Sequence, residues 1–299
     1  MPQDKITAFF APFRNNVIGM DLHHELGGEI RPVIYADWTA SGRLYEPIED
    51  YISHVLGPYV ANTHTESTLT GGAMTKAYHQ ARQTIKDHVN AHENDAIILA
   101  GAGMTVVINK LQRMMGLKIP EHIKNEVNIP EEDKPVVIIT HMEHHSNQTT
   151  WQECEVTLEI IQRDEKGLPD LDHLRTLLEQ YKDRKMKIGS FTACSNVTGL
   201  MTPLAEMAQI MHQHNGLCFA DYAASAPYVK IDMHPENPLQ KLDVVMFSPH
   251  KFLGGPGSSG VMIFDKALYG LKVPDQPGGG TVAWTNPWGG HKYFDDVET

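Results

Sequence analysis

The sequence predicts an α/β fold, with a mostly parallel sheet and helices on both faces. Short apolar runs of strand length alternate with amphipathic stretches of helix length through most of the 299 residues. This alternation is typical of strands joined by helical crossovers, which cover both faces of a parallel sheet. A chain of this length can bury a large core without disulfides or structural metals. The runs that predict strands are residues 96–100, 136–140, 156–161, 188–194, 217–220 and 244–248.

Helical periodicity fills the segments between these runs. Apolar residues recur every three or four positions, which is the spacing of one helix face. These stretches are residues 78–89, 170–182 and 203–215. Pro203 stands near the start of the last stretch and Gly216 directly after it, as helix boundaries favour. Residues 117–134 are polar and contain prolines, which predicts a surface insertion.

The composition narrows the classes of function. A formal net charge of -12 disfavours a nucleic-acid partner, because phosphate binding needs a basic face. No apolar run approaches the ~20 residues that span a bilayer, so no membrane partner is expected. The beginning, MPQDKITAFFAPFRNN, lacks the features of a secretory signal. Cys154, Cys194 and Cys218 show no framework spacing, which favours reduced thiols in a cytoplasmic protein.

Polar groups follow five of the predicted strands. In an open α/β sheet, ligands bind at the carboxyl ends of the strands. Polar residues at several such ends are a stronger indication of a site than any single motif. The groups are the turn at 101–105, the Glu-His-His run at 143–145, Asn196, Asp221, and the segment 248–251.

Two of these residues are of types that could bind a cofactor with an aldehyde group. Lys251 follows the strand-like run at 244–248, and a lysine forms an imine with an aldehyde when its surroundings lower its pKa. Asp221 follows the run at 217–220, and a buried carboxylate can keep a pyridine nitrogen protonated. A protonated pyridine ring is an electron sink.

The remaining groups suit a phosphate and a proton shuttle. The turn at 103–105 offers backbone N–H groups, a helix N-terminus and the Thr105 hydroxyl. Ser248 and His250 would complete such an anion site. An imidazole such as that of His144 can stack on a ring and move protons.

Each group alone has a simpler interpretation. Lys251 could be a solvated strand end, the glycine turn a tight bend, and Asp221 a turn cap. The histidine-rich run at 141–145 raises a zinc site as an alternative. It lacks the HExxH helical spacing, however, and successive residues at a strand end point in different directions. We therefore predict no metal site.

The motifs resemble those of a known family. In order they are YADWTASG at 35–42, GAGMTVVIN at 101–109, MEHHSN at 142–147, CSNVTG at 194–199, ADYAAS at 220–225, SPHKFLGGPGSSG at 248–260 and GGGT at 278–281. Together they resemble the class V aminotransferase-like family of fold-type I pyridoxal-phosphate enzymes, nearest to cysteine desulfurases and selenocysteine lyases. The resemblance runs from Tyr35 to about Thr281, and EHHSN, SNVTG and HKFLGGPG are its most specific parts.

The resemblance implies roles around the ring of pyridoxal 5'-phosphate. Lys251 would carry the cofactor as a Schiff base, and Asp221 would pair with the pyridine nitrogen. His144 would stack on one face of the ring, while Ala223 would pack against the other. Asn196 would lie near the ring oxygen or the substrate carboxylate.

The resemblance also implies how the phosphate is held. Thr105, Ser248 and His250 would bind it, with the backbone of Gly103 and Met104 nearby. Thr281 would reach the phosphate of a neighbouring subunit in a homodimer, whose active site would lie near the interface.

The chain departs from the family at two motifs. Desulfurases commonly have a Gln three residues after the aspartate, where it donates to the ring hydroxyl, but this chain has Ala224. Ser225 is a candidate substitute. Residues 62–65 read Asn-Thr-His-Thr where the family usually has Asn-x-His-Arg, which leaves substrate handling open.

We expect three parts along the chain: an N-terminal segment at 1–34, a pyridoxal-phosphate-binding large domain at 35–281, and the start of a connection at 282–299. We expect the family's smaller C-terminal domain, with an Arg for the substrate carboxylate and a sulfur-accepting Cys in desulfurases, to be missing, so that the chain is either a fragment or an unusually short member. Cys194 and Cys218 lie in apolar runs that predict core thiols, and Cys154 is expected to be semi-exposed at most. None is predicted to accept sulfur.

The resemblance therefore implies a transferase or lyase that acts on an amino acid. Desulfurase-like or selenocysteine lyase-like chemistry would release sulfur or selenium and give alanine, with a possible sulfur-acceptor protein as partner. Two alternatives stay open. The chain could catalyse another reaction of the family (lyase, epimerase or transamination), or it could be a truncated cofactor-binding chain without activity.

Overall fold

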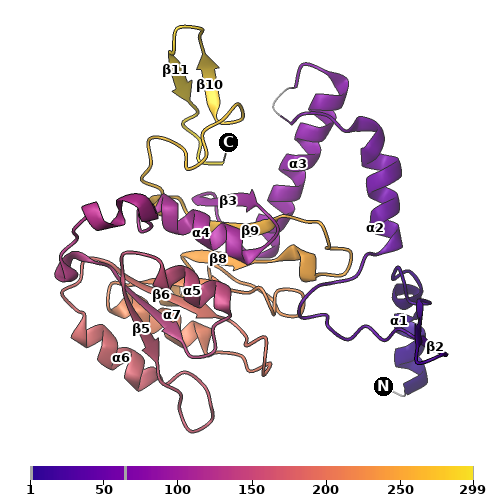
Figure 1. Ribbon diagram of the computed structural model, residues 1–299, viewed down its shortest axis with the longest axis horizontal. Helices are drawn as coiled ribbons and strands as arrows, with labels where there is room; N and C mark the ends of the chain where they lie inside the picture. Colours follow the sequence, from indigo (N-terminus) through magenta and orange to yellow (C-terminus); the bar gives the residue numbers. More distant parts are fainter. Residues whose placement is uncertain (1–2, 64–65, 299) are drawn as a thin grey trace. The chain divides into compact units, whose positions relative to one another are not determined.

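The computed structural model describes residues 3–63 and 66–298, and Figure 1 traces them. The chain divides into two compact units. The N-terminal unit contains the described residues up to Ala81 together with Pro249–Ser258, and the sheet unit contains Arg82–Ser248 and the described residues from Ser259 on. Among the described residues, no helix combines the length and apolar character needed to cross a membrane. His64 and Thr65, from the motif at 62–65, lie outside the described residues.

A seven-stranded sheet forms the core of the sheet unit, in the spatial order β3-β9-β8-β7-β6-β4-β5. The strands are β3 (Asp95–Ala100), β4 (Val136–Thr140), β5 (Thr157–Ile161), β6 (Lys187–Thr192), β7 (Leu217–Asp221), β8 (Val244–Phe247) and β9 (Gly260–Asp265). β9 is antiparallel to both β3 and β8, and all other neighbours are parallel. The predicted mostly parallel sheet is confirmed, and β9 is a strand that the sequence patterns did not predict.

Helices cover both faces of this sheet. They are α4 (Met104–Met114), α5 (His145–Gln152), α6 (Leu171–Gln180) and α7 (Leu204–Gln213). α4 packs with α5, and α6 packs with α7. Ile188 of β6 belongs to the core cluster of α4 and α5, whereas a Cβ added to Gly189 would lie 3.1 Å from Met211 Cγ of α7. Because successive strand residues point to opposite faces, the two helix pairs lie on opposite sides.

The directions of the strands bring the turns that follow several of them to one edge of the sheet. β3 and β8 are both antiparallel to β9, so they run parallel to each other and to β7, β6 and β4. Their carboxyl ends therefore lie along the same edge. We call this edge the carboxyl edge; the polar groups that the sequence places after β3, β4, β6, β7 and β8 all begin there.

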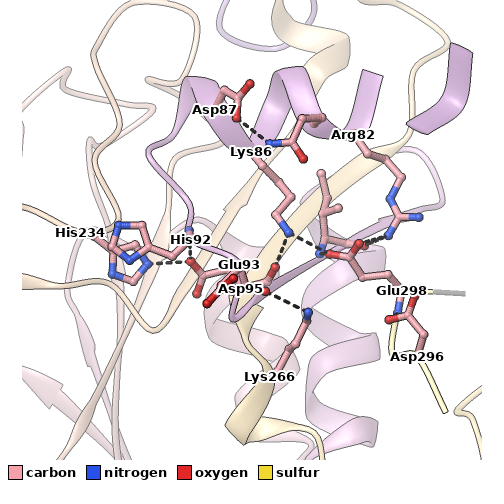
Figure 2. Close-up of polar contacts among 12 residues, drawn as sticks. Arg82, Lys86, Asp87, His92, Glu93, Asp95, His234, Lys266, Asp296 and Glu298 are labelled. Atoms are coloured by element: carbon pink, nitrogen blue, oxygen red, sulfur yellow. Dashed lines mark hydrogen bonds and ion pairs between the residues drawn. The ribbon is translucent and has the colours of Figure 1, made fainter. Parts of the chain in front are cut away.

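At the opposite edge, charged side chains are hydrogen-bonded to one another, as Figure 2 shows around Asp95, the first residue of β3. Asp95 is 2% exposed, and its Oδ2 accepts hydrogen bonds from His234 Nε2 and the His92 backbone N–H, each at 2.6 Å. The rings of His92 and His234 stack with centroids 3.8 Å apart. These contacts tie the start of the sheet to the loop before β8.

Outside the sheet, the chain forms small elements. In the N-terminal unit these are α1 (Gln3–Asn15), the hairpin β1 (His23–Leu26) and β2 (Glu29–Pro32), α2 (Glu46–Asp50) and a π-helical segment (Tyr51–Leu56). α3 (Leu69–His88) begins in the N-terminal unit and ends in the sheet unit. A second hairpin joins β10 (Val282–Thr285) to β11 (His291–Tyr293). Residues 117–134 are mostly exposed and contain short 3-10 turns, which agrees with the predicted surface insertion.

Candidate cofactor site

The turn between β3 and α4 forms the predicted phosphate end of the site. Gly101 has a φ of +55°, and a Cβ there would lie 2.5 Å from a Val106 methyl, so the turn needs glycine. The backbone N–H of Met104, the first residue of α4, donates to Ser248 Oγ at 2.9 Å. Thr105 follows on the exposed side of this first turn. The structure thus brings Met104, Thr105 and Ser248 together at a helix N-terminus, which favours anions.

Asp221 ends β7 at the same edge. The residue is 3% exposed, and its Oδ1 accepts a hydrogen bond from the Ala223 backbone N–H at 2.8 Å. Its carbonyl oxygen accepts from Ala193 N, so the turn beyond β7 is fastened to the chain leaving β6. The result is a buried carboxylate in a fixed orientation, with Ala223, 9% exposed, two residues farther on.

His144 is the N-cap of α5 and is exposed. Its Nδ1 lies 3.2 Å from the Ser146 backbone N, which donates to it, and 2.8 Å from Ser146 Oγ. A ring nitrogen that accepts from a backbone N–H carries no proton itself. The neutral imidazole therefore holds its proton on Nε2, where it can be exchanged with a ligand.

Asn196 lies in a tight loop after β6. Ser195 Oγ accepts hydrogen bonds from Val197 N and Thr198 N, each at 3.2 Å, and Gly199 has a φ of +71°. These local bonds fold the Ser-Asn-Val-Thr-Gly motif and leave Asn196 exposed.

Lys251 and His250 belong to the N-terminal unit, in a short 3-10 turn that follows β8. Both residues are half-buried. The Gly42 backbone N–H donates to the His250 carbonyl at 2.8 Å, and a Cβ on Gly42 would lie 1.8 Å from the Phe252 carbonyl oxygen. Burial lowers the pKa of His250, and the positive charge of Lys251 lowers it further. The YADWTASG motif thus supports the lysine loop by direct backbone contact.

Thr281 lies just before β10 and is half-buried. Its Oγ1 accepts a hydrogen bond from Gly278 N at 3.0 Å, which closes the Gly-Gly-Gly-Thr turn. The predicted contact of Thr281 with a neighbouring subunit stays a prediction.

The residues of the sheet unit fit pyridoxal 5'-phosphate. Asp221 supplies the buried acid that a pyridine nitrogen needs. The N-terminus of α4, with the Thr105 and Ser248 hydroxyls, supplies donors of the kind that a phosphate needs. Ser225 Oγ is buried and has no hydrogen-bond partner among residues 3–63 and 66–298. A ring oxygen would give that hydroxyl a partner, since buried polar groups are normally hydrogen-bonded.

Two polar residues of this edge have no role assigned from the sequence. Glu143 and Asn147 hydrogen-bond to each other and to the end of β6. Burial raises the pKa of Glu143 to about 7. Both residues lie inside the MEHHSN motif, from which only the histidine received a role.

The cysteines partly differ from expectation. Cys154 is 6% exposed, which lies within the expected upper limit, and it packs in the core beneath α4 and α5. Cys218 is fully buried as expected, whereas Cys194 lies beyond the end of β6 and is half-buried. Burial raises the pKa of Cys154 to about 11 and raises those of Cys194 and Cys218 as well. All three thiols are therefore poor nucleophiles.

Comparisons with known proteins agree on one family. The class-V aminotransferase family model matches residues 34–292. A cysteine desulfurase of Synechococcus elongatus is 28% identical over 257 residues, which cover 85% of this chain and 38% of the relative. A probable cysteine desulfurase of Halalkalibacterium halodurans is 30% identical over 268 residues, or 86% of this chain and 59% of the relative.

Solved structures show the same fold. The apo cysteine desulfurase from Thermococcus onnurineus superposes with a TM-score of 0.68 at 22% identity, over 89% of this chain and 62% of that one. A NifS-like protein from Rickettsia africae gives a TM-score of 0.66 at 20% identity, over 83% and 61%. The chain spans less than two thirds of the length of these relatives. Since the family model covers nearly all of the sheet unit and much of the N-terminal unit, the chain belongs to the class-V aminotransferase family.

Proposed function

We propose that this chain binds pyridoxal 5'-phosphate at the carboxyl edge of its sheet and acts on cysteine or selenocysteine, releasing sulfur or selenium and giving alanine. The observation that carries the proposal is the placement of Asp221, His144 and the α4 N-terminus at one edge of one sheet. The similarity to proteins named cysteine desulfurase supports the choice of substrate.

The proposed roles follow from the atoms available. When bound, the cofactor supplies an aldehyde for amines and a ring that accepts electrons. Asp221, oriented by the Ala223 N–H, holds a proton on the ring nitrogen. Lys251 Nζ would hold the cofactor through its aldehyde and, once free, would move a proton at the substrate Cα. His144 exchanges the proton on its Nε2 with the substrate.

The phosphate contacts orient the cofactor for these steps. The α4 N-terminus offers backbone N–H groups and its positive dipole end, and the Thr105 and Ser248 hydroxyls add donors. His250, whose pKa is lowered by burial, adds a neutral N–H donor near pH 7. Holding the phosphate would keep the cofactor near Asp221.

Sulfur transfer needs a thiol that this chain does not readily supply. The substrate Cβ–S bond breaks, the sulfur passes to an acceptor thiol as a persulfide, and a proton replaces it at Cβ. Cys154, Cys194 and Cys218 all have raised pKa values, which keeps them protonated. The acceptor is then a thiol of another molecule, or of the part of the relatives that this chain does not span.

A second reaction with the same cofactor is favoured by two observations. Ala224 stands at the family's Gln position, and no described cysteine suits sulfur transfer. Another class-V reaction, such as lyase, epimerase or transamination chemistry, needs neither that Gln nor a sulfur-accepting cysteine. Measuring sulfide or selenide together with alanine, against keto-acid formation, separates the two functions. Cofactor binding without any turnover would indicate a binding chain alone.

Lys251→Ala tests the cofactor assignment directly. The parent chain is mixed with pyridoxal phosphate, reduced with borohydride and analysed by peptide mass spectrometry, with Lys166→Ala as an exposed-lysine control. We expect one reduced adduct, on Lys251, in the parent and the control, and none in Lys251→Ala. A stoichiometric adduct on another lysine would contradict the assignment.

A further inference from the structure

Glu143 joins three elements at the carboxyl edge. Its Oε1 accepts hydrogen bonds from Thr140 N at 3.2 Å, Thr140 Oγ1 at 2.6 Å and Thr192 N at 2.9 Å. Its Oε2 accepts one from Asn147 Nδ2 at 2.7 Å. These donors belong to the end of β4, the end of β6 and the first turns of α5. One carboxylate therefore fixes the geometry of two strands and a helix.

The strand register explains why an acceptor is needed there. β4 ends at Thr140, and the last pair between β4 and β6 is Ile139 with Ser190. β6 continues to Thr192, whose backbone N–H lies beyond that last pair. A buried N–H without an acceptor is costly, and Glu143 Oε1 supplies the acceptor that the strand does not.

Asn147 fixes the other oxygen of the carboxylate. The residue is fully buried, and its Oδ1 accepts from Ser190 Oγ at 2.7 Å and Trp151 Nε1 at 3.2 Å. Its Nδ2 donates to the Ser190 carbonyl at 3.1 Å as well as to Glu143. With both ends of the amide engaged, Asn147 cannot flip without losing bonds. Glu143 Oε2 must accept, which is the role of an ionised carboxylate.

Glu143 also lies in the electrostatic field of Asp221. Thr192, which donates to Glu143, is the register partner of Asp221 across β6 and β7. Burial raises the pKa of Glu143 to about 7, the negative charge of Asp221 adds to the rise, and the hydrogen bonds from Thr140, Thr192 and Asn147 oppose it. The influence is mutual, so an ionised Glu143 strengthens the negative potential around Asp221.

His144 is held by the same contacts. It follows Glu143 directly and caps α5, whose Asn147 is bound to Ser190 of β6. The position of the imidazole therefore depends on how firmly the start of α5 is attached to β6.

We infer that Glu143 is a positioning residue of the proposed cofactor site: it holds His144 and Asp221 in register and adds a second negative charge beside the acid. The inference rests on the proposed function. A ring nitrogen paired with Asp221 keeps its proton more firmly when Glu143 is ionised. A purely structural role would change the stability of the fold and leave that proton affinity unaltered.

Glu143→Gln tests the inference by removing the charge at nearly constant shape. Its amide oxygen can still accept from Thr140 and Thr192, but its NH2 group faces the NH2 group of Asn147. We expect the dissociation constant for pyridoxal phosphate to rise about tenfold, or about 1.4 kcal/mol. The midpoint of the pH titration of the bound cofactor's visible absorption should fall by roughly one pH unit.

Glu159→Gln is the matched control, because Glu159 also accepts a hydroxyl, that of Tyr181, but on β5. It should leave the affinity and the midpoint unchanged. Glu143→Asp keeps the charge and shortens the reach; it should weaken affinity while keeping the midpoint near that of the parent. This variant also supplies the affinity test should Glu143→Gln not fold.

The outcomes separate the inference from the function on which it rests. A parent chain that takes up no pyridoxal phosphate overturns both. A parent that binds it, with folded Glu143 variants of unchanged affinity and midpoint, overturns the inference alone. A weakened affinity with an unmoved midpoint in Glu143→Gln would reduce Glu143 to a structural residue and contradict the proposed electrostatic role.

Discussion

Replacing Glu298 with Gln should lower the free energy of unfolding by roughly 2–4 kcal/mol. Glu298 lies against the end of α3 and the edge of β3, as Figure 2 shows. Its Oε2 lies 2.6 Å from Arg82 Nη2, and its Oε1 lies 3.2 Å from Lys86 Nζ. The Ile97 backbone N–H donates to the same Oε1 at 2.9 Å. The carboxylate thus neutralises two cations and satisfies an N–H of an edge strand.

The magnitude follows from the burial of the charges. The side chains of Arg82, Lys86 and Glu298 are 7%, 12% and 19% exposed. Removing one partner of a fully buried ion pair costs about 3–5 kcal/mol, because the remaining charge is left uncompensated. Partial exposure of Glu298 reduces that cost, and a Gln oxygen can still accept from Ile97. An exposed pair such as Lys182 with Glu179, 61% and 66% exposed, contributes little, because water screens both charges.

Urea unfolding followed by tryptophan fluorescence measures the difference, with fully buried Trp151 as a reporter. Glu179→Gln is the matched control for an exposed ion pair. Equal m-values in the two variants would show that the same surface unfolds in both. A Glu298→Gln protein within about 0.5 kcal/mol of the control would refute the argument from burial.

Three further predictions concern the carboxyl edge. Ser225→Ala removes a buried hydroxyl without a partner in the described part of the chain, so it should raise the free energy of unfolding of the cofactor-free chain by roughly 1 kcal/mol. The same variant should bind pyridoxal phosphate more weakly in calorimetry, and unchanged binding would exclude a contact between Ser225 and the ring. Ser248→Ala should lower the affinity for pyridoxal phosphate roughly tenfold and leave the affinity for pyridoxal unchanged. An equal loss of affinity for both ligands would argue against a role of Ser248 in phosphate binding. Because burial raises the pKa of Glu143 from 4.5 to about 7, the folded chain retains a proton that the unfolded chain loses. Stability should therefore fall by up to about 3 kcal/mol as pH rises through this range, and urea midpoints of Glu143→Gln should lack that slope.

The strand ends could be predicted from sequence because local signals define them. Apolar runs mark β3, β4 and β8, and the polar residues after them begin where each run stops. The rule that parallel strands share an edge then places these residues together, and the strand directions confirm that placement. The placement of Asp221 and Ser248 at the carboxyl edge therefore follows from local sequence patterns and the sheet rule alone.

Other features depend on contacts that a local pattern does not contain. β9 has an apolar run at residues 261–264, yet the sequence alone does not show that it inserts antiparallel between β3 and β8. The role of Glu143 depends on β4 ending before β6, which is a property of register. The burial of Cys154 depends on α4 and α5 packing together. Each of these needs the relative position of elements far apart in the chain.

Two carboxylates at opposite ends of the strands show how the two edges of the sheet differ. Asp243 precedes β8 at the amino edge, and its oxygens lie 2.9 Å from His212 Nε2 and 2.8 Å from Lys241 Nζ. Burial alone would raise the pKa of Asp243, but the bonds to His212 and Lys241 lower it below its ordinary value. Glu143, at the carboxyl edge, accepts from neutral donors alone within residues 3–63 and 66–298, and its pKa rises to about 7.

A carboxylate that is paired with cations stays ionised and stabilises the fold. A carboxylate whose pKa lies near the ambient pH can change its protonation state when a ligand binds beside it. At the amino edge, a ligand would have to break ion pairs that already exist. At the carboxyl edge, a cationic ring nitrogen beside Asp221 would reduce the repulsion that acts on Glu143. Binding a protonated pyridine should therefore favour the ionised form of Glu143, and this coupling is the reason that the proposed site is expected at the carboxyl edge and not at the amino edge.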